Sequence, residues 1–277
     1  MPSLSTLVDN FNDGTIAPDW GNSYGGVSET GGRARVPCTT GFAGYQTAYS
    51  WTFAGASLYV KVPTVPAAST ATEAYCGMLV NSPTAGTRIG FTIKAVGSLL
   101  RMQSDSGYFD GAAVEIAYNA TTHAFLRLRE DGTNVYWDTS PDGSTWTNRR
   151  TLATPAWVTT EIDTCALDMS AHRDAGTDDY AEYDLFNTLA NGATHDATGT
   201  GSMDVTVTAA AQHTAVMVGS GSFNTDVAAS ASAVYYVTGS GSLDTDATAS
   251  AASDVVTNVD TLVGSPTSGW AVSRPWR

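Results

Sequence analysis

The sequence predicts an all-β protein, with an antiparallel sandwich in front and short β-repeats behind it. Short runs of β-branched and aromatic residues alternate with turns rich in Gly, Pro, Asn and Asp, which is typical of sandwiches and barrels. No segment keeps an apolar stripe at helical spacing over three turns. A 20-residue period near the C-terminus indicates a repeated β-unit. Hydrophobic residues make up 42% of the chain, which is enough for a packed core.

The sandwich is expected over residues 1–187. Its predicted strands are Ala48–Phe53, Ser57–Val62, Tyr75–Val80, Arg88–Lys94, Leu99–Gln103, Phe125–Glu130, Asn134–Asp138 and Val158–Ile162. The dipeptide Asp131-Gly132 joins two of them into the clearest hairpin, because Asp-Gly favours the tight turns that connect antiparallel strands. The segment from Ser140 to Trp146 resembles an Asp-box turn, in which Asp142 bonds the turn backbone and Trp146 packs beneath it.

A small, polar linker at residues 188–198 separates the sandwich from three 20-residue repeats at residues 199–258. Each repeat opens on Gly-x-Gly-Ser and continues with an apolar residue: Met203, Phe223 or Leu243. Apolar and polar residues then alternate, which predicts half-buried strands. A second apolar run follows, so we expect two strands per repeat, with the Gly-x-Gly turn between repeats.

The inward positions of the repeats are mostly small, so one repeat alone buries little surface. We therefore expect the repeats to form a β-stalk with partner copies, and a homotrimer is the favoured assembly. Residues 259–277 contain Trp270, Trp276 and two arginines, residue types that are enriched at interface hot spots. This tail is predicted to dock the assembly.

The net charge of −14 is unevenly distributed along the chain. Residues 174–273 contain 12 Asp and Glu residues and neither Lys nor Arg. A surface of this sign repels phosphates, which excludes nucleic acid as an expected partner and disfavours anionic membrane surfaces. No apolar run approaches the ~20 residues that a spanning helix needs, so no membrane insertion is expected. The N-terminus lacks the pattern of a signal peptide, so export by a route that needs no signal is expected.

Residues 7–187 resemble the concanavalin A-like lectin and glucanase jelly rolls. The resemblance rests on the opening Leu7-Val8-Asp9-Asn10-Phe11-Asn12-Asp13-Gly14 with Trp20, on Gly32-Arg33-Ala34-Arg35-Val36, and on the closing Ala181-Glu182-Tyr183-Asp184-Leu185-Phe186. The segment Tyr136–Trp146 fits the same pattern. The resemblance implies a jelly roll in which the first and last strands pair.

With its glycine-rich repeats and its Ser-Gly-Trp tail, the whole chain resembles the minor tail proteins of phages that infect actinobacteria. That resemblance implies a virion protein, exposed outside the cell, with other tail proteins and host cell-surface polysaccharide as partners. A purely structural virion decoration or connector protein is one alternative. A secreted carbohydrate-binding module is another.

The sequence leads us to expect no enzymatic activity. Concanavalin-like endoglucanases carry three alternating carboxylates on one strand as nucleophile, helper and acid. Here Glu161 and Asp163 supply two, and Thr164, Cys165 and Ala166 stand where the third is needed. There is no Gly-x-Ser-x-Gly elbow, and the four histidines form no metal-binding pattern.

Sugar binding requires exposed aromatic rings and a few polar groups that contact hydroxyls. Tyr24 and Tyr108 lie in glycine-rich loops, where an aromatic side chain has little reason to be core, and Arg101 and Asp105 are their expected polar partners. Further candidates were Trp20, Tyr45, Tyr49, Trp157, Arg88 and Asn81. For any single one of these aromatic residues, core packing is the competing explanation.

One structural calcium is the only cofactor that the sequence suggests, and none is required. Many jelly-roll lectins hold calcium where the first and last strands meet, which makes Asp9 and Asp184 the candidate ligands. The competing explanation for Asp9 and its neighbours is turn formation by Asp and Asn side chains.

Overall fold

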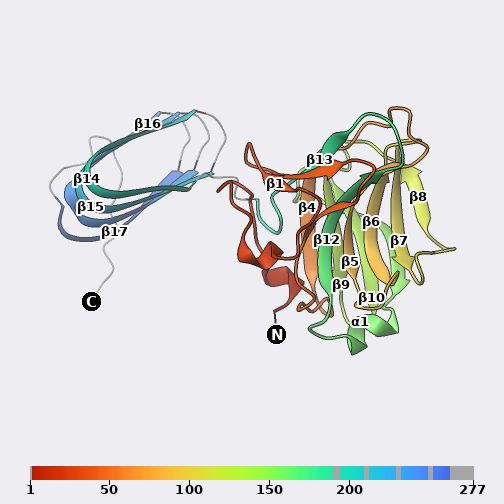
Figure 1. Ribbon diagram of the computed structural model, residues 1–277. Helices are drawn as coiled ribbons and strands as arrows, with labels where there is room; N and C mark the ends of the chain where they lie inside the picture. The colour runs from red at the N-terminus through yellow and green to blue at the C-terminus, as the bar shows by residue number, and fades with distance from the viewer. Residues whose placement is uncertain (1, 190–193, 209–211, 229–231, 249–251, 263–277) are drawn as a thin grey trace. The chain divides into compact units, whose positions relative to one another are not determined.

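The computed structural model describes residues 2–189, 194–208, 212–228, 232–248 and 252–262, which belong to two compact units, Met1–Leu189 and Ala190–Arg277. In the first unit, two antiparallel sheets pack face to face (Figure 1). No helix among the described residues is long and apolar enough to cross a membrane.

The first unit contains thirteen strands and three short helices. They are η1 (Leu4–Thr6), η2 (Pro18–Trp20), β1 (Ser28–Glu29), β2 (Ala34–Cys38), β3 (Ala43–Gln46), β4 (Ser57–Thr64), β5 (Ala74–Asn81), β6 (Arg88–Lys94), β7 (Leu99–Asp105), β8 (Val114–Ala117), β9 (Phe125–Glu130), β10 (Asn134–Ser140), β11 (Thr147–Ala153), α1 (Ala156–Thr160), β12 (Ala166–Arg173) and β13 (Asp179–Asp184). One sheet has the order β1-β2-β13-β4-β9-β10-β11, and the other has the order β3-β12-β5-β6-β7-β8.

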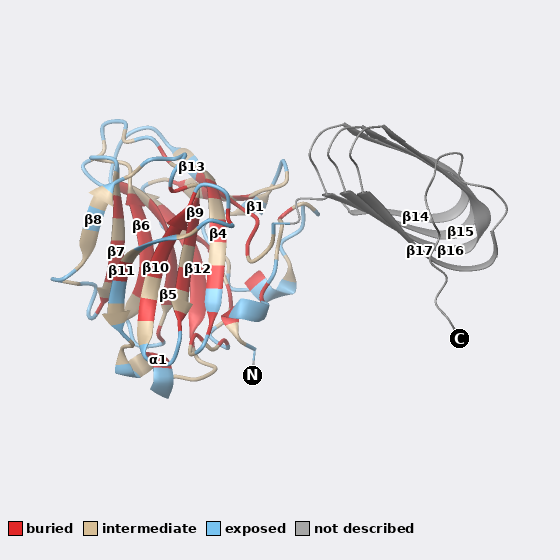
Figure 2. Cartoon of the chain, turned by 180° about the vertical axis from the view of Figure 1, so that it is seen from behind, coloured by how far each residue is buried: buried red, intermediate tan, exposed pale blue. Residues whose placement is uncertain are grey.

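The core fills the space between these two sheets, and the buried residues lie on the strand faces that meet there (Figure 2). Alternation along each strand produces this arrangement: Leu58 and Val60 of β4 point inward, and Tyr59 between them does not. Trp137 ties the sheets together, because its buried indole Nε1 donates a 2.8 Å hydrogen bond to the Gly90 carbonyl of β6. The two ends of the domain pair at Asp9 and Phe186, as the resemblance implied.

Six of the eight predicted strands are present, and two predictions are wrong. Residues Ala48–Phe53 form no strand, although Trp51 and Thr52 make isolated bridges to Cys165 and Ser3. Val158–Ile162 overlaps the helix α1, which follows Pro155. Pro155 is the N-cap of this helix, in extended backbone, and the Thr159 and Thr160 hydroxyls bond back to the Ala156 carbonyl.

The second unit is a parallel sheet of four long strands, β14 (Thr194–Thr208), β15 (Gln212–Ala228), β16 (Ser232–Thr248) and β17 (Ala252–Leu262). β14, β15 and β16 stack with an offset of 20 residues, so Met203 lies beside Phe223, and Phe223 beside Leu243. The offset between paired strands equals the 20-residue period of the sequence. The predicted β-repeats after the sandwich are therefore present.

Two details of the repeats differ from the expectation. β14 begins at Thr194, inside the predicted linker. The Gly-x-Gly segments lie within long strands instead of forming turns between two short ones, and Gly199, Gly219 and Gly239 stack on one another. Glycine permits this because stacked backbones with no side chain can approach and bend without a steric clash. Of the predicted docking tail, residues 259–277, the first four belong to β17, and residues 263–277 lie outside the described residues.

Candidate functional site

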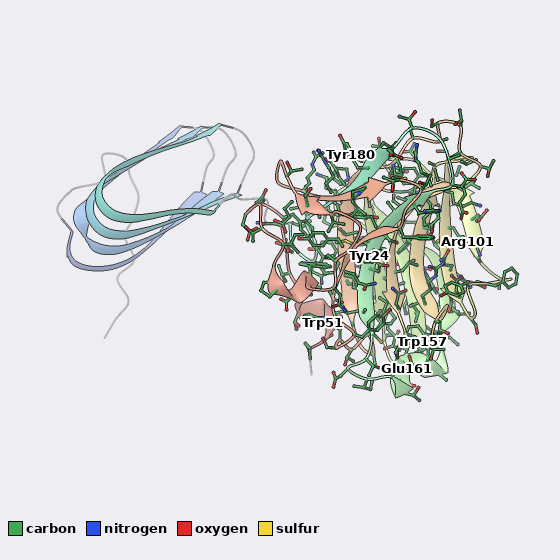
Figure 3. All side chains as sticks on the ribbon, in the orientation of Figure 1. Tyr24, Trp51, Arg101, Trp157, Glu161 and Tyr180 are labelled. Carbon is green, nitrogen blue, oxygen red and sulfur yellow. The ribbon has the colours of Figure 1, made fainter. Side chains whose placement is uncertain are left out.

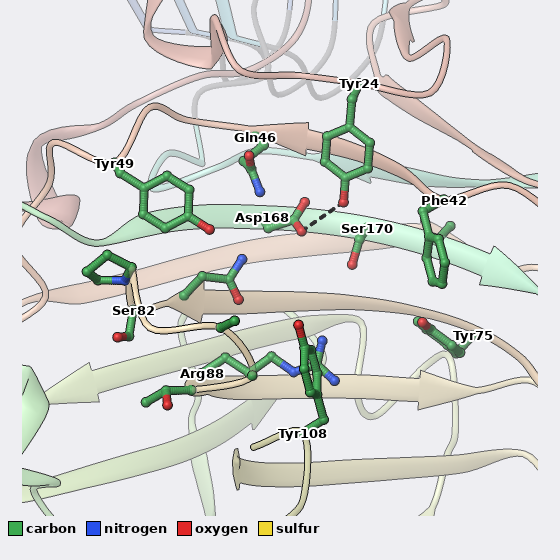
Figure 4. A pocket seen from close by; sticks show the side chains of 16 residues that line it. Tyr24, Phe42, Gln46, Tyr49, Tyr75, Ser82, Arg88, Tyr108, Asp168 and Ser170 are labelled. Atoms are coloured by element: carbon green, nitrogen blue, oxygen red, sulfur yellow. Dashed lines mark hydrogen bonds between the residues drawn. The ribbon is translucent and has the colours of Figure 1, made fainter. Parts of the chain in front are cut away.

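A pocket of ≈ 450 Å³ lies on the outer face of the sheet that contains β3, β12, β5 and β6 (Figure 4). Its lining is dominated by tyrosines and by uncharged polar groups. The lining residues are Tyr24, Phe42, Gln46, Tyr49, Tyr75, Asn81, Ser82, Pro83, Ala85, Gly86, Thr87, Arg88, Tyr108, Asp168, Ser170 and Ala171. Among these described residues, Asp168 is the one carboxylate and Arg88 the one cation.

Asp168 is a buried carboxylate with one unsatisfied oxygen. It alternates along β12 with the core residues Leu167 and Met169, so it projects from the opposite face, yet only 7% of it is exposed. The Tyr24 hydroxyl donates to its Oδ2 at 3.1 Å, while its Oδ1 has no hydrogen-bond partner within the described part of the chain. Burial raises the pKa of Asp168 to about 6, against the opposing effects of the Tyr24 hydrogen bond, the nearby Gln46 and Asn81 amides and the Arg88 charge.

Gly44 explains how Tyr24 and Asp168 come together. The backbones of Tyr24 and Gly44 exchange two hydrogen bonds, of 2.9 and 3.1 Å, which place the tyrosine ring over β3. A Cβ atom on Gly44 would lie 2.2 Å from Asp168 Oδ1 and 2.7 Å from the Tyr24 ring. Any other residue at this position would therefore push the pair apart.

Tyr108 is exposed and yet held in place. Its φ of 66° lies in the left-handed region, which is uncommon for an aromatic residue. Its backbone N–H donates to the Gly86 carbonyl at 2.9 Å, and the Arg88 guanidinium lies 5.6 Å from the centre of its ring. Strained backbone that is fixed by its surroundings is a feature of binding sites.

Phe42 forms a second buttressed ring at the pocket. Its ring stacks on the His172 imidazole at 4.1 Å, with an angle of 16° between the planes. In the described residues, nine large apolar or aromatic side chains are exposed, and four of them line this one pocket: Tyr24, Phe42, Tyr49 and Tyr108. A concentration of exposed aromatic rings around one cavity indicates a binding surface.

The structure brings together part of the predicted sugar site. Tyr24 and Tyr108 both line the pocket, as do the further candidates Tyr49, Arg88 and Asn81. Arg101 and Asp105 do not line it. Arg101 donates to Glu115 at 3.2 Å, and the carboxylate of Asp105 accepts from Arg88 Nε at 2.8 Å, so Asp105 contributes by fixing Arg88.

The remaining aromatic candidates have structural environments. Trp20 and Tyr45 are fully buried, and Trp157 of α1 packs against the core (Figure 3). Sequence reasoning missed Asp168, Phe42, Gln46 and Tyr75. The alternation of Asp168, Ser170 and His172 with apolar residues was a signal for β12 and its polar outer face, but this strand was not predicted.

The calcium prediction remains untested, and the geometry gives it no support. The Asp9 carboxylate already accepts from the Phe11 amide and the Trp20 indole, both at 2.8 Å. Asp184 lies 4.0 Å from the Lys61 ammonium, which takes the place a cation would occupy. The described residues contain no group of three His, Cys, Asp or Glu side chains arranged to hold a metal ion.

The incomplete glucanase motif does not lie on a strand. Glu161 ends α1, at one end of the sandwich (Figure 3), and Asp163 follows in a turn where it accepts a 2.7 Å hydrogen bond from Thr52. Neither lines the pocket. The Asp142 part of the predicted Asp-box turn is confirmed, because Asp142 accepts from the backbone N–H groups of Ser144 and Thr145 at 2.9 and 2.7 Å. Trp146 is half-buried, and its ring contacts Tyr59 and Arg127.

Comparisons with known proteins give structural neighbours only. No protein-family model matches the chain, and no curated protein matches it. Among solved structures, the Bacteroides ovatus xyloglucan PUL protein GH43B is 16% identical with a TM-score of 0.45, and covers 67% of this chain. The chain spans only 38% of that protein's length. The apo Crh5 transglycosylase is 12% identical with a TM-score of 0.48, and the match covers 67% of this chain and 84% of that one. SCLam, a non-specific endo-β-1,3(4)-glucanase of family GH16, is 8% identical with a TM-score of 0.45, and the match covers 65% of this chain and 88% of that one.

The sandwich is a concanavalin-like jelly roll. The antiparallel two-sheet architecture confirms the predicted all-β class. The expectation of a chain without enzymatic activity is contradicted, because these structural neighbours are glycoside hydrolases and a transglycosylase. Glu161 and Asp163, the two carboxylates on which that expectation rested, do not lie on a strand of the sheet.

Proposed function

We propose that the jelly-roll domain binds a carbohydrate in the pocket between Tyr24, Asp168 and Tyr108. The observation that supports this most strongly is the group of exposed aromatic side chains, Tyr24, Phe42, Tyr49 and Tyr108, around one pocket that also contains the buried carboxylate of Asp168. The apolar faces of sugar rings pack well on aromatic rings, and a sugar hydroxyl can donate to a carboxylate.

The other polar groups of the pocket suit the same ligand. Hydroxyl groups both donate and accept, so a sugar needs acceptors and donors in one place. Asp168 is the acceptor, while the amides of Gln46 and Asn81 and the guanidinium of Arg88 are donors. The carbohydrate-active proteins that share this fold make a glycan ligand a natural expectation.

A glycan array probed with the full chain tests this proposal. We expect binding to at least one glycan, and we expect Asp168→Asn to weaken it by roughly ten- to a hundredfold, as for loss of a charged hydrogen bond. Asp184→Asn is the matched control, because Asp184 is also a buried acid with an unpartnered Oδ1 but lies on the other sheet. Equal effects of the two substitutions would argue against this site.

We further propose that the full chain is a component of a phage tail, in which the repeats present the jelly roll to the host surface. The Gly-x-Gly repeats, their in-register parallel stacking and the sequence resemblance support this role. Other tail proteins and host polysaccharide are the corresponding partners, and a homotrimer is the favoured assembly. A structural connector role in the virion and a secreted carbohydrate-binding module are the alternatives.

Light scattering and binding to host envelopes separate these alternatives. A trimeric mass together with binding to envelope polysaccharide supports a host-attachment role. A trimer that binds no envelope fraction supports the connector, and a glycan-binding monomer supports the carbohydrate-binding module.

A further inference from the structure

The pocket has two exposed ring platforms, and Asp168 lies between them. The first platform is Phe42, which is 65% exposed and stacks on His172. The second is Tyr108, which is 68% exposed and lies over Arg88. Figure 4 shows the two rings on different sides of the Asp168 carboxylate.

The strand register gives the separation of the platforms. His172 lies four residues beyond Asp168 on β12, or roughly 13 Å at 3.3 Å per residue. Arg88 of β6 pairs with Asn81 of β5, which in turn pairs with Ala166 of β12. Arg88 is therefore two strands away from β12, level with Ala166, which lies six residues before His172. At about 4.8 Å between strands, the backbones that carry the two platforms are on the order of 20 Å apart.

Both platforms are rigid in spite of their exposure. The His172 imidazole that supports Phe42 is itself fixed by a 3.1 Å contact of its Nδ1 with the Gly41 carbonyl. Tyr108 is fixed by its hydrogen bond to Gly86, where a Cβ would meet the Tyr108 backbone nitrogen at 2.7 Å. Exposed aromatic rings that are ordered in advance reduce the entropy lost when a ligand stacks on them.

We propose that the site recognises several consecutive sugar units of an oligosaccharide, which lies diagonally across β12, β5 and β6. One unit stacks on Phe42, another stacks on Tyr108, and a unit between them donates a hydroxyl to Asp168. This inference rests on the proposed carbohydrate-binding function and assigns its ligand as a glycan chain, not a single sugar. A single sugar would leave at least one platform uncovered.

Titration of the full chain with three oligosaccharide ladders of one to six units tests this inference. The probes are β-1,3-gluco-, β-1,4-gluco- and β-1,4-xylo-oligosaccharides, and isothermal calorimetry gives the affinity for each length. We expect the affinity to increase with length beyond two units in at least one ladder.

Phe42→Ala and Tyr108→Ala should each lower the affinity for the longest oligomer by about three- to tenfold, the usual contribution of one aromatic stacking contact. They should leave the affinity for the shortest bound oligomer nearly unchanged.

Two exposed aromatic residues that do not line the pocket provide the controls. Phe109 is 71% exposed and adjacent to Tyr108 but does not line the pocket. Tyr180 stacks on Arg35 with its ring 4.0 Å from the guanidinium carbon, and it belongs to the other sheet. Phe109→Ala and Tyr180→Ala should therefore retain the full dependence on length, and thermal melts of all four variants verify folding.

The outcomes distinguish this inference from the function on which it rests. A monosaccharide that binds as tightly as its hexamer overturns the chain-binding inference alone. Platform variants that behave like the two controls do the same. No affinity for any member of the three ladders, together with a negative glycan array, overturns both.

Discussion

At the scale of single residues, Asp168 combines a cost in stability with a capacity for binding. Its pKa is raised from 3.8 to about 6, so the folded state holds a proton that the unfolded chain has already released. Stability therefore falls as pH rises from about 4 to about 6, by an amount on the order of 3 kcal/mol.

The substitution Asp168→Asn should stabilise the protein at pH 8 by up to about 3 kcal/mol, because it removes a buried charge. The difference from wild type should shrink near pH 4, where the native carboxyl is already protonated. Chemical denaturation at both pH values measures this. A variant that is less stable than wild type at pH 8 would show that the ionised carboxylate is satisfied in the fold.

Ligand binding at Asp168 should depend on pH in the opposite sense. A sugar hydroxyl that donates to the Asp168 carboxylate stabilises the ionised form, so binding lowers the pKa of the carboxyl. Affinity should be full above about pH 6 and fall as the pH drops below it. Calorimetric titration of a bound oligosaccharide between pH 5 and 8 measures this, and affinity that is constant over the range would exclude Asp168 as the acceptor.

At the scale of elements, Glu182 of β13 holds three strands of the other sheet together. Its carboxylate accepts from Arg33 and Arg35, both at 2.7 Å, and from the Thr64 hydroxyl of β4 at 2.6 Å. Burial by itself would raise the pKa of Glu182, but these hydrogen bonds outweigh it and lower the pKa to about 2. The charged form is thus satisfied here, in contrast to Asp168.

Glu182→Gln should destabilise the protein at pH 7 by up to about 3 kcal/mol, because the lowered pKa is a stabilisation of the folded state. The contribution of Glu182 is fully present above about pH 4.5 and is lost as the pH falls toward 2. Denaturant midpoints at pH 7 and pH 3 should therefore differ less in the variant than in wild type. An unchanged midpoint at pH 7 would mean that Arg33 and Arg35 lose nothing when the charge is removed.

At the scale of the whole molecule, two units use β-structure in different ways. The jelly roll buries aromatic and branched side chains between its two antiparallel sheets. In the repeat unit, equivalent positions of successive repeats pair with one another, so Gly199 pairs with Gly219 and Met203 pairs with Phe223. Since each unit has its own strand ladder, the jelly roll should not need the repeats in order to fold.

Residues 1–189 expressed alone should unfold cooperatively, with a thermal midpoint close to that of the same domain in the full chain. Circular dichroism melts of both forms test this. A broad or strongly lowered transition in the fragment would show that the repeats contribute to the stability of the jelly roll.

The sequence by itself determined the all-β class, the 20-residue period and six of the thirteen strands of the first unit, because period-two patterns and turn residues are local signals. It failed at Val158–Ile162, where Pro155 starts a helix, and it missed β12, whose outer face carries Asp168. Only the tertiary structure decided the candidate site. Tyr24, Tyr108 and Asp168 come from distant parts of the chain and meet through sheet register and through the space left by Gly44. Strand order decides which outward-facing residues line one pocket. Strand order results from contacts between distant segments, so local sequence patterns do not predict it.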